Sequence, residues 1–272
     1  MGERSLTPGE KPARAFRLLL EYDGTGFMGW QVQPCMRTVQ GELEQTLARI
    51  LGTRVRVTGA GRTDRGVHAL GQAAGFMAAT DRSAGEILSG LNACLPLDVR
   101  VRDVREVHTG FHARHSALRR RYRYLMRLEP TAIDRDRCWV LRHAVKVGRM
   151  RKAVVGLLGE HDFRRFTIGA SETEHTRAII YETSLKKQGP VLRFEIEGNR
   201  FLRRMVRAIV GTLVEVGRGR FDTDVFRRAL CPEGEILPFA VAPARGLYLV
   251  SVTYDEGPPG PSGGTPRNRR RG

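Results

Sequence analysis

The stretch Gly59-Ala60-Gly61-Arg62-Thr63-Asp64-Arg65-Gly66-Val67-His68 places one carboxylate among three glycines and two arginines. Residues 54–58, directly before it, alternate Arg-Val-Arg-Val-Thr, which predicts a strand that ends at this loop. The glycines permit a sharp exit from the strand and a close approach of the backbone to a ligand. Asp64 is therefore expected on a tight, positively charged loop, where it stays ionised and available as a nucleophile or base.

A second interpretation of the same loop is a surface turn. Asp side chains commonly accept hydrogen bonds from nearby backbone amides, and glycine-rich turns present them. The loop alone does not separate an active site from such a turn, so the remainder of the chain must decide.

Outward from this loop, apolar periodicity predicts strands and helices in alternation, which is typical of an α+β fold. The expected strands cover residues 15–22, 55–58, 67–78, 99–107, 116–128, 178–186, 191–198 and 247–254. The expected helices cover residues 39–51, 83–95, 147–158, 201–216 and 222–230. Because each half of the chain holds several strands and at least two helices, we expect two similar halves, 15–112 and 113–255, with a cleft between them.

The two ends differ from this pattern. Residues 1–14 and 256–272 have no periodicity and little apolar content, which predicts a flexible N-terminal segment and a disordered basic tail. The arginines between Arg267 and Arg271 suit either a weak phosphate contact or a solvated tail, and we assign them no essential role.

The charge of the chain indicates a polyanionic partner. The sequence holds 46 Lys and Arg against 29 Asp and Glu, a net charge of +17, and only five of the bases are Lys. Guanidinium groups pair bidentately with phosphate and stack on bases, so nucleic acid is a better match than a membrane surface. A GC-rich genome would give the same preference for Arg through codon usage.

Other classes of protein find less support. No apolar run of 18 residues and no secretory signal pattern is present, so we expect a cytoplasmic protein without a membrane partner. The four cysteines are far apart and form no CxxC pair, which favours buried free thiols over zinc or disulfides; they are Cys35, Cys94, Cys138 and Cys231.

Two motifs suggestive of cofactors are set aside. His108, His112 and His115 have the spacing of a helical metal site, but the Thr109-Gly110 turn argues against a helix there. Asp64 stands where a dinucleotide fingerprint needs its third glycine, and the chain has no GxxxxGK[ST] sequence. The expectation is a protein without a metal or a nucleotide cofactor.

Two further positions have residues that suit an RNA-binding site. Tyr122 lies among Arg120, Arg121 and Arg123, an arrangement that suits stacking on an unpaired base, although a half-buried strand tyrosine would look the same. In the expected helix 201–216, Arg207 suits either a solvated face or contact with a carboxylate in the cleft.

Six blocks occur along the chain in a fixed order. They are YDGTGFMGWQ at 22–31, GAGRTDRGVHA at 59–69, FHAR at 111–114, RYRY at 121–124, GNRFLRRMVRAIVG at 198–211 and APARGLYL at 242–249. Together they resemble the tRNA pseudouridine synthase A (TruA) family over about residues 16–254, whereas the two tails lie outside the resemblance.

The resemblance implies two ferredoxin-like halves with joined, mostly antiparallel sheets and a central basic cleft. It implies isomerisation of uridine to pseudouridine at positions 38, 39 and 40 of the tRNA anticodon stem-loop. No cofactor or metal is expected, because the glycosidic bond is broken and remade within one nucleotide. Members of the family act as homodimers.

The same resemblance assigns roles to individual residues. Asp64 would be the nucleophile, with attack on the base, attack on the ribose and assistance to an elimination all open. Arg207 would pair with Asp64, and Tyr122 would stack on the uracil and help to remove the C5 proton. Leu247 would pack beneath that ring, and Arg62 would fill the space left by the flipped nucleotide.

Further arginines are expected to contact RNA. They are Arg65, Arg114, Arg120, Arg121, Arg203 and Arg204. Many members of the family carry a small residue at the position of Arg65, so this extra cation bears on the choice among neighbouring uridines. The alternatives are a non-catalytic RNA-binding protein or RNA chaperone on the same scaffold, and a relative that modifies uridines outside the anticodon arm.

Overall fold

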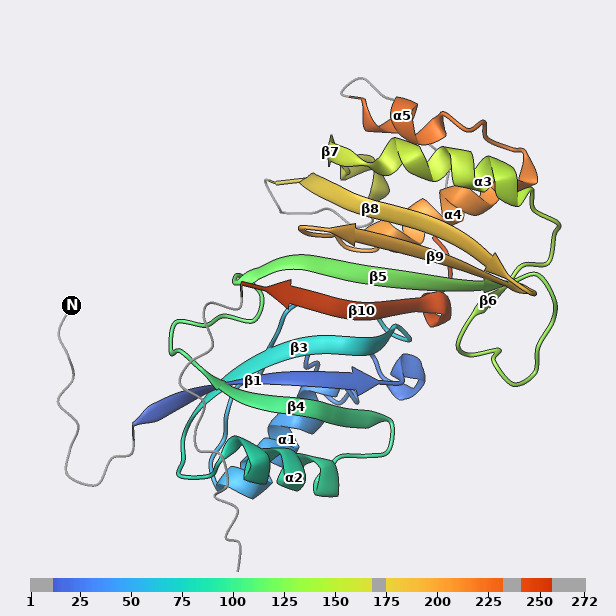
Figure 1. Cartoon of the computed structure of the whole chain (residues 1–272). Helices are drawn as coiled ribbons and strands as arrows, with labels where there is room; N and C mark the ends of the chain where they lie inside the picture. Colours follow the sequence, from blue (N-terminus) through green and yellow to red (C-terminus); the bar gives the residue numbers. More distant parts are fainter. Residues whose placement is uncertain (1–11, 168–174, 232–240, 256–272) are drawn as a thin grey trace, which may run out of the picture.

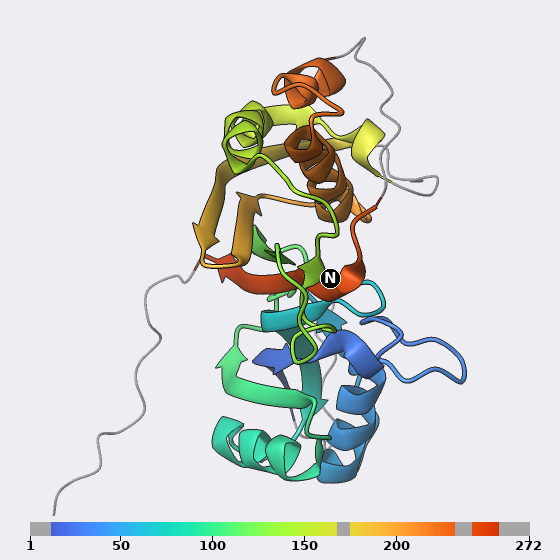
Figure 2. The same ribbon diagram turned by 90° about the vertical axis from the view of Figure 1, so that its right-hand side faces the viewer.

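A ten-stranded sheet runs through both halves of the described protein (Figures 1 and 2). The computed structural model describes residues 12–167, 175–231 and 241–255. Eight strands follow the order β4-β1-β3-β10-β5-β9-β8-β7, while β2 pairs with β3 and β6 pairs with β5. All neighbouring pairs are antiparallel except β3 with β10 and β5 with β6.

The N-terminal half supplies the lower part of the sheet in Figure 1 and two helices that pack on it. Its elements are β1 (Ala13–Tyr22), the 3-10 turn η1 (Gly24–Gly26), α1 (Val39–Leu51), β2 (Thr58–Gly59), β3 (His68–Ala79), α2 (Ala84–Cys94) and β4 (Val99–Val107).

The C-terminal half supplies the upper part of the sheet and three helices. Its strands are β5 (Ala117–Arg127), β6 (Trp139–Val140), β7 (Gly159–Asp162), β8 (Arg177–Gln188), β9 (Val191–Gly198) and β10 (Leu247–Tyr254). Its helices are α3 (Val147–Val154), α4 (Met205–Arg218) and α5 (Val225–Leu230), with the 3-10 turns η2 (Val155–Leu157), η3 (Arg164–Phe166) and η4 (Ala244–Gly246).

Each half has the βαββαβ order of a ferredoxin-like fold. In the C-terminal half, β5, β8, β9 and β10 lie in the order β10-β5-β9-β8. In the N-terminal half, β4-β1-β3 continues the same pattern, and β2 occupies the remaining position with two residues. Because β2 covers only part of the β3 edge, β10 pairs with the other end of β3 and joins the two sheets. The expected α+β fold of two joined halves is confirmed.

Local signals explain why several elements match their expected bounds. The side chain of Thr38 caps α1 by accepting from the amide of Gly41, and Gly52 ends the helix with a left-handed φ of 71°. Ser83 and Glu86 form a reciprocal capping box at the start of α2. The apolar faces of these helices and of β1 meet in a buried core.

Three expected features differ from the structure. Of the strand expected at 55–58, only Thr58 is in a strand, β2, since the amide and carbonyl of Val57 bond to the side chains of Glu44 and Gln40 on α1 and not to β3. The helix expected from residue 201 begins at Met205, because Arg204 has a left-handed φ of 61° that interrupts helical geometry. Of the cysteines expected to be buried, only Cys138 is; the other three are exposed.

The ends of the described chain bear on two expectations. The strand β1 starts at Ala13, so Ala13 and Arg14 lie in the sheet and not in the expected flexible segment. The rest of that segment, 1–11, and the basic tail 256–272 lie outside the described residues. Within the described ranges, no helix has the length and apolar content needed to cross a membrane.

Candidate active site at the join of the two halves

The loop that carries Asp64 is held against a buried tryptophan. The amide of Trp30 donates to the carbonyl of Thr63 at 3.0 Å, and the amide of Val67 closes a turn onto the carbonyl of Asp64 at 3.1 Å. A β-carbon on Gly29, which has a φ of 102°, would lie 2.7 Å from the carbonyl oxygen of Thr63. Only glycine allows this approach, so the backbone around Asp64 is closely packed on its inner side.

Side chains of β1 and β3 hold the same loop through hydrogen bonds. The hydroxyls of Tyr22 and Thr63 lie 2.8 Å apart, and Nε2 of Gln72 donates to the carbonyl of Gly61 at 2.9 Å. Burial raises the pKa of Tyr22, so its phenol stays protonated. Gln72 is fully buried in β3. Sequence reasoning did not single out these supports; the one available signal was a glutamine within an apolar strand.

Asp64 forms an ion pair with Arg207 across the join. The distance from Nη1 of Arg207 to Oδ2 of Asp64 is 3.0 Å, and Nε of Arg207 donates to the carbonyl of Ala242 at 2.7 Å. The Arg207 side chain is 15% exposed and that of Asp64 is 29% exposed. One half thus supplies the carboxylate and the other half supplies the cation that orients it, while the carboxylate remains accessible to a ligand.

Tyr122 and Leu247 lie on the same face of the sheet, in neighbouring strands. Tyr122 is in β5 and Leu247 is in β10, opposite Tyr124. The Tyr122 ring packs edge-on against Phe201 with 5.0 Å between centroids, and a β-carbon on Gly61 would lie 3.7 Å from its hydroxyl.

The Tyr122 hydroxyl makes no hydrogen bond within the described part of the chain. Burial raises its pKa to about 12, and the charge of Asp64 acts in the same direction, while Arg120 opposes them. The phenol is therefore neutral at pH 7.

Four of the expected RNA contacts are free cations on the surface. The side chains of Arg62, Arg65, Arg114 and Arg203 are exposed and make no hydrogen bond or ion pair with any described residue. Arg62 and Arg65 flank Asp64 on its own loop. These four positions are consistent with contacts to phosphate, since unpaired guanidinium groups are available to bind it.

The other three arginines that were expected to contact RNA are bonded to protein groups or are partly buried. Arg120 is partly buried, and its two Nη atoms donate to four backbone carbonyls; they belong to Ala60, Arg114, Ala117 and Asn199. Arg121 pairs with Glu182 and Glu197 on the sheet face away from Tyr122, because successive strand residues alternate in direction. Arg204 precedes α4, and its Nε is buried without a hydrogen-bond partner among the described residues.

The described ranges contain no cluster of side chains suited to bind a metal ion. No three side chains among His, Cys, Asp and Glu gather there in an arrangement that could hold a metal ion. The segment 108–116 is not helical.

Comparisons with known proteins identify the family of the chain. A family profile described as tRNA pseudouridine synthase matches residues 19–116 and 153–255. Three relatives, each named tRNA pseudouridine synthase A, cover 89% of this chain. That of Exiguobacterium sibiricum is 39% identical over 243 residues and 98% of its own length. Those of Geobacter sp. strain M21 and Pseudothermotoga lettingae are 40% and 41% identical over their whole length. The chain therefore belongs to the tRNA pseudouridine synthase family of isomerases, which modify tRNA.

Proposed function

We propose that this protein isomerises uridine to pseudouridine at positions 38, 39 and 40 of the tRNA anticodon stem-loop, with Asp64 as the nucleophile. The observation that carries the proposal is the Asp64–Arg207 ion pair at 3.0 Å, formed across the join beside a buried tyrosine. The reaction breaks the N1–C1′ bond, turns the uracil while it is held and joins C5 to C1′. One oriented carboxylate and a close pocket are sufficient for it.

The target nucleotide reaches Asp64 by leaving the stem-loop. Unstacking costs a few kcal/mol, and stacking on Tyr122 returns roughly 1–3 kcal/mol. The exposed Arg62 occupies the space that the nucleotide leaves, while Leu247 supports the other side of the uracil. The neutral phenol of Tyr122 favours a stacking role over that of a resting general base, because proton removal needs the phenolate.

The active form is a homodimer in this proposal. The resemblance to the family carries this part of the proposal, and the sheet face opposite the helices of the N-terminal half exposes large apolar side chains spaced along β1 and β3. They are Leu19, Leu70 and Met77, exposed by 39%, 41% and 50%. Light scattering of the purified protein tests this, and a monomeric mass at micromolar concentration would count against the dimer.

Tritium release from tRNA transcripts that carry 5-³H-uridine tests the catalytic proposal. The wild type should release tritium and leave pseudouridine at positions 38 to 40, whereas Asp64→Ala should release none and keep its affinity for tRNA within several-fold. Release by Asp64→Ala would refute its role as nucleophile. Binding without release by the wild type would favour the RNA chaperone, and pseudouridine elsewhere would favour a relative with another target.

A further inference from the structure

The two halves share a short backbone connection. β3 and β10 pair at two positions, with Tyr248 opposite His68 and Leu249 opposite Ala69. Such a short pairing contributes few backbone hydrogen bonds, so side-chain contacts across it matter for the angle between the halves. Asp64 and Arg207 lie on opposite sides of this join, and any change in that angle changes the distance between them.

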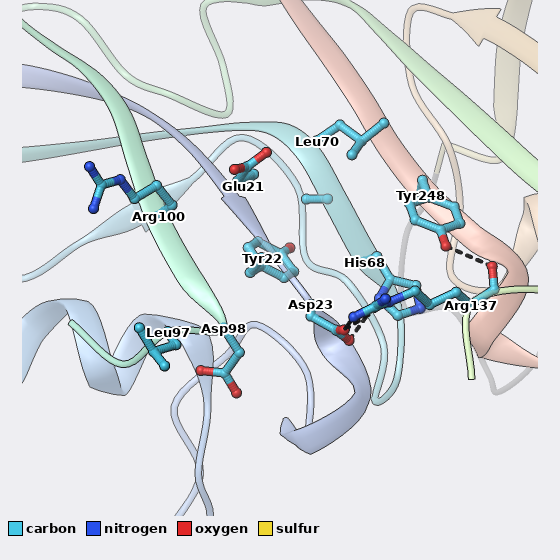
Figure 3. Close-up of a pocket in the computed structure, with 11 residues that line it drawn as sticks. Glu21, Tyr22, Asp23, His68, Leu70, Leu97, Asp98, Arg100, Arg137 and Tyr248 are labelled. Atoms are coloured by element: carbon cyan, nitrogen blue, oxygen red, sulfur yellow. Dashed lines mark hydrogen bonds and ion pairs between the residues drawn. The ribbon is translucent and has the colours of Figure 1, made fainter. Parts of the chain in front are cut away.

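Four residues cross the join next to this pairing, and we call them the clasp: Asp23, His68, Arg137 and Tyr248 (Figure 3). Arg137 lies on the connection between β5 and β6 and reaches into the N-terminal half, where its Nη2 donates to Oδ2 of Asp23 at 2.9 Å. The backbone carbonyl of Arg137 accepts from the hydroxyl of Tyr248 at 2.6 Å. One residue of the C-terminal half is thus held to β10 and to the end of β1.

His68 lies at the centre of the clasp and is 2% exposed. Its Nε2 lies 3.1 Å from the carbonyl oxygen of Arg245 and 3.2 Å from that of Asp136. Because carbonyls only accept, Nε2 carries the proton, and Nδ1 accepts from the amide of Gly24 at 3.1 Å. The ring also stacks on Tyr248 with 4.7 Å between centroids.

The charge state of His68 follows from two opposing effects. Burial lowers its pKa, whereas the carboxylate of Asp23, with Oδ1 3.2 Å from Nδ1, raises it. Burial is the larger effect, and the amide of Gly24 already points at Nδ1, so we describe the ring as neutral and not as one member of an ion pair.

The sequence positions of these contacts connect the clasp to the chemistry. His68 follows Asp64 by four residues, and Arg245 precedes Leu247 by two. The imidazole of His68 therefore lies at the end of the Asp64 loop and is hydrogen-bonded to the backbone just before β10, the strand that carries Leu247.

We propose that the clasp is a positioning device for the reaction, in which His68 and the Asp23–Arg137 pair fix the halves so that Asp64 meets Arg207 and the target uracil. The clasp touches none of the reacting atoms, so its members are positioning residues. The proposal rests on the proposed role of Asp64 as the nucleophile.

The test uses Arg137→Ala, which removes an exposed side chain and leaves the core intact. We expect the rate of tritium release at saturating tRNA to fall about tenfold, with the Kd for tRNA unchanged within twofold, because small misplacements of reacting groups cost rate and not binding. Arg137→Lys should recover part of the rate. Arg135→Ala is the matched control from the same connection, since Arg135 is 74% exposed and pairs with its neighbour Asp136.

A second variant asks whether the clasp acts as a unit. Asp23→Asn should slow release as much as Arg137→Ala, and the double variant should be no slower than either single one. The proposal would be overturned if the rate losses of the two single variants multiplied in the double variant. A wild-type rate for Arg137→Ala would also overturn it. So would a weaker affinity of Arg137→Ala for tRNA with an unchanged rate at saturation, because that result indicates a direct tRNA contact. Asp64→Ala is measured in parallel, and tritium release by that variant would refute the proposed function. If Asp64→Ala is inactive but the Arg137 and Asp23 variants release tritium at the wild-type rate, only the clasp proposal is refuted.

Discussion

Arg207 and Asp64 are 143 residues apart in sequence and 3.0 Å apart in space. The second donor of Arg207, Nε, is fixed on the carbonyl of Ala242, and the amide of Ala242 returns a hydrogen bond to the carbonyl of Arg207 at 3.1 Å. The guanidinium group therefore cannot turn away from Asp64 without losing a second contact. The carboxylate is held in one orientation.

Replacement of Arg207 by Lys should lower the rate of tritium release by about 30-fold, equivalent to about 2 kcal/mol, since one ammonium group cannot hold both partners. The affinity for tRNA should stay within threefold. Arg218→Lys, at the other end of the same helix and paired with Glu215, is the control. Full activity of the Arg207→Lys variant would show that the second contact is dispensable.

Two substitutions of Tyr122 should separate the contribution of its ring from that of its hydroxyl. Phe should preserve the contact with Phe201 and the affinity for tRNA, whereas Ala should weaken binding by roughly 1–3 kcal/mol through lost stacking. Because the pKa of Tyr122 is about 12, the pH–rate profile should show no step from this group between pH 7 and 9. A step present in the wild type and absent in Tyr122→Phe would contradict a neutral phenol.

Removal of the Arg62 side chain should weaken tRNA binding and reduce the slope of log Kd against log salt by about one, as expected for a lost phosphate contact. Arg49→Ala is the matched control, because Arg49 is exposed in the last turn of α1. Filter binding at four salt concentrations gives the slope. An unchanged slope would assign Arg62 a role other than phosphate binding.

Asp23 should contribute to stability in a pH-dependent way. Burial alone would raise its pKa, but hydrogen bonds from Thr25 and Arg137 outweigh that effect and lower the pKa to about 2 from an ordinary value of 3.8. Its contribution is present above pH 3.8 and is lost as the pH falls through about 2. For this partly exposed group we expect about 1–2 kcal/mol.

Urea unfolding of Asp23→Asn between pH 2 and 6 measures that contribution. The variant should be less stable than the wild type at pH 6, and the two should converge near pH 2. Asp136→Asn serves as the control, since this exposed carboxylate has a single partner, its neighbour Arg135, among the described side chains. A constant difference across the range would show that Asp23 acts through packing and not through its charge.

Much of the fold follows from local pattern. The strands β4, β9 and β10 and the helix α1 have the bounds that periodicity and capping predict. The start of α4 does not, because the left-handed backbone at Arg204 depends on how 200–204 packs and not on its helix propensity. The alternation at 54–57 predicts a longer strand than the structure shows, because side chains of α1 take the backbone hydrogen bonds of Val57, and a pattern within one segment does not reveal such contacts.

The candidate site shows the same division. Asp64 is conspicuous in the sequence, but its contact with Arg207 required the family resemblance, since nothing local connects two residues so far apart. Sequence pattern also did not distinguish Arg121, which faces glutamates, from Arg65, whose side chain is free within the described chain. Strand direction decides that difference, and it is fixed only when the sheet is assembled.

The position of β10 has a consequence for biosynthesis. This strand lies between β3 and β5, yet it is the last described strand to leave the ribosome. Until it emerges, β3 and β5 present open edges that could pair with other chains. The nascent N-terminal half can fold early, but the candidate site is completed only after β10 has been translated, so a product truncated before β10 would lack part of that site and would be prone to aggregate.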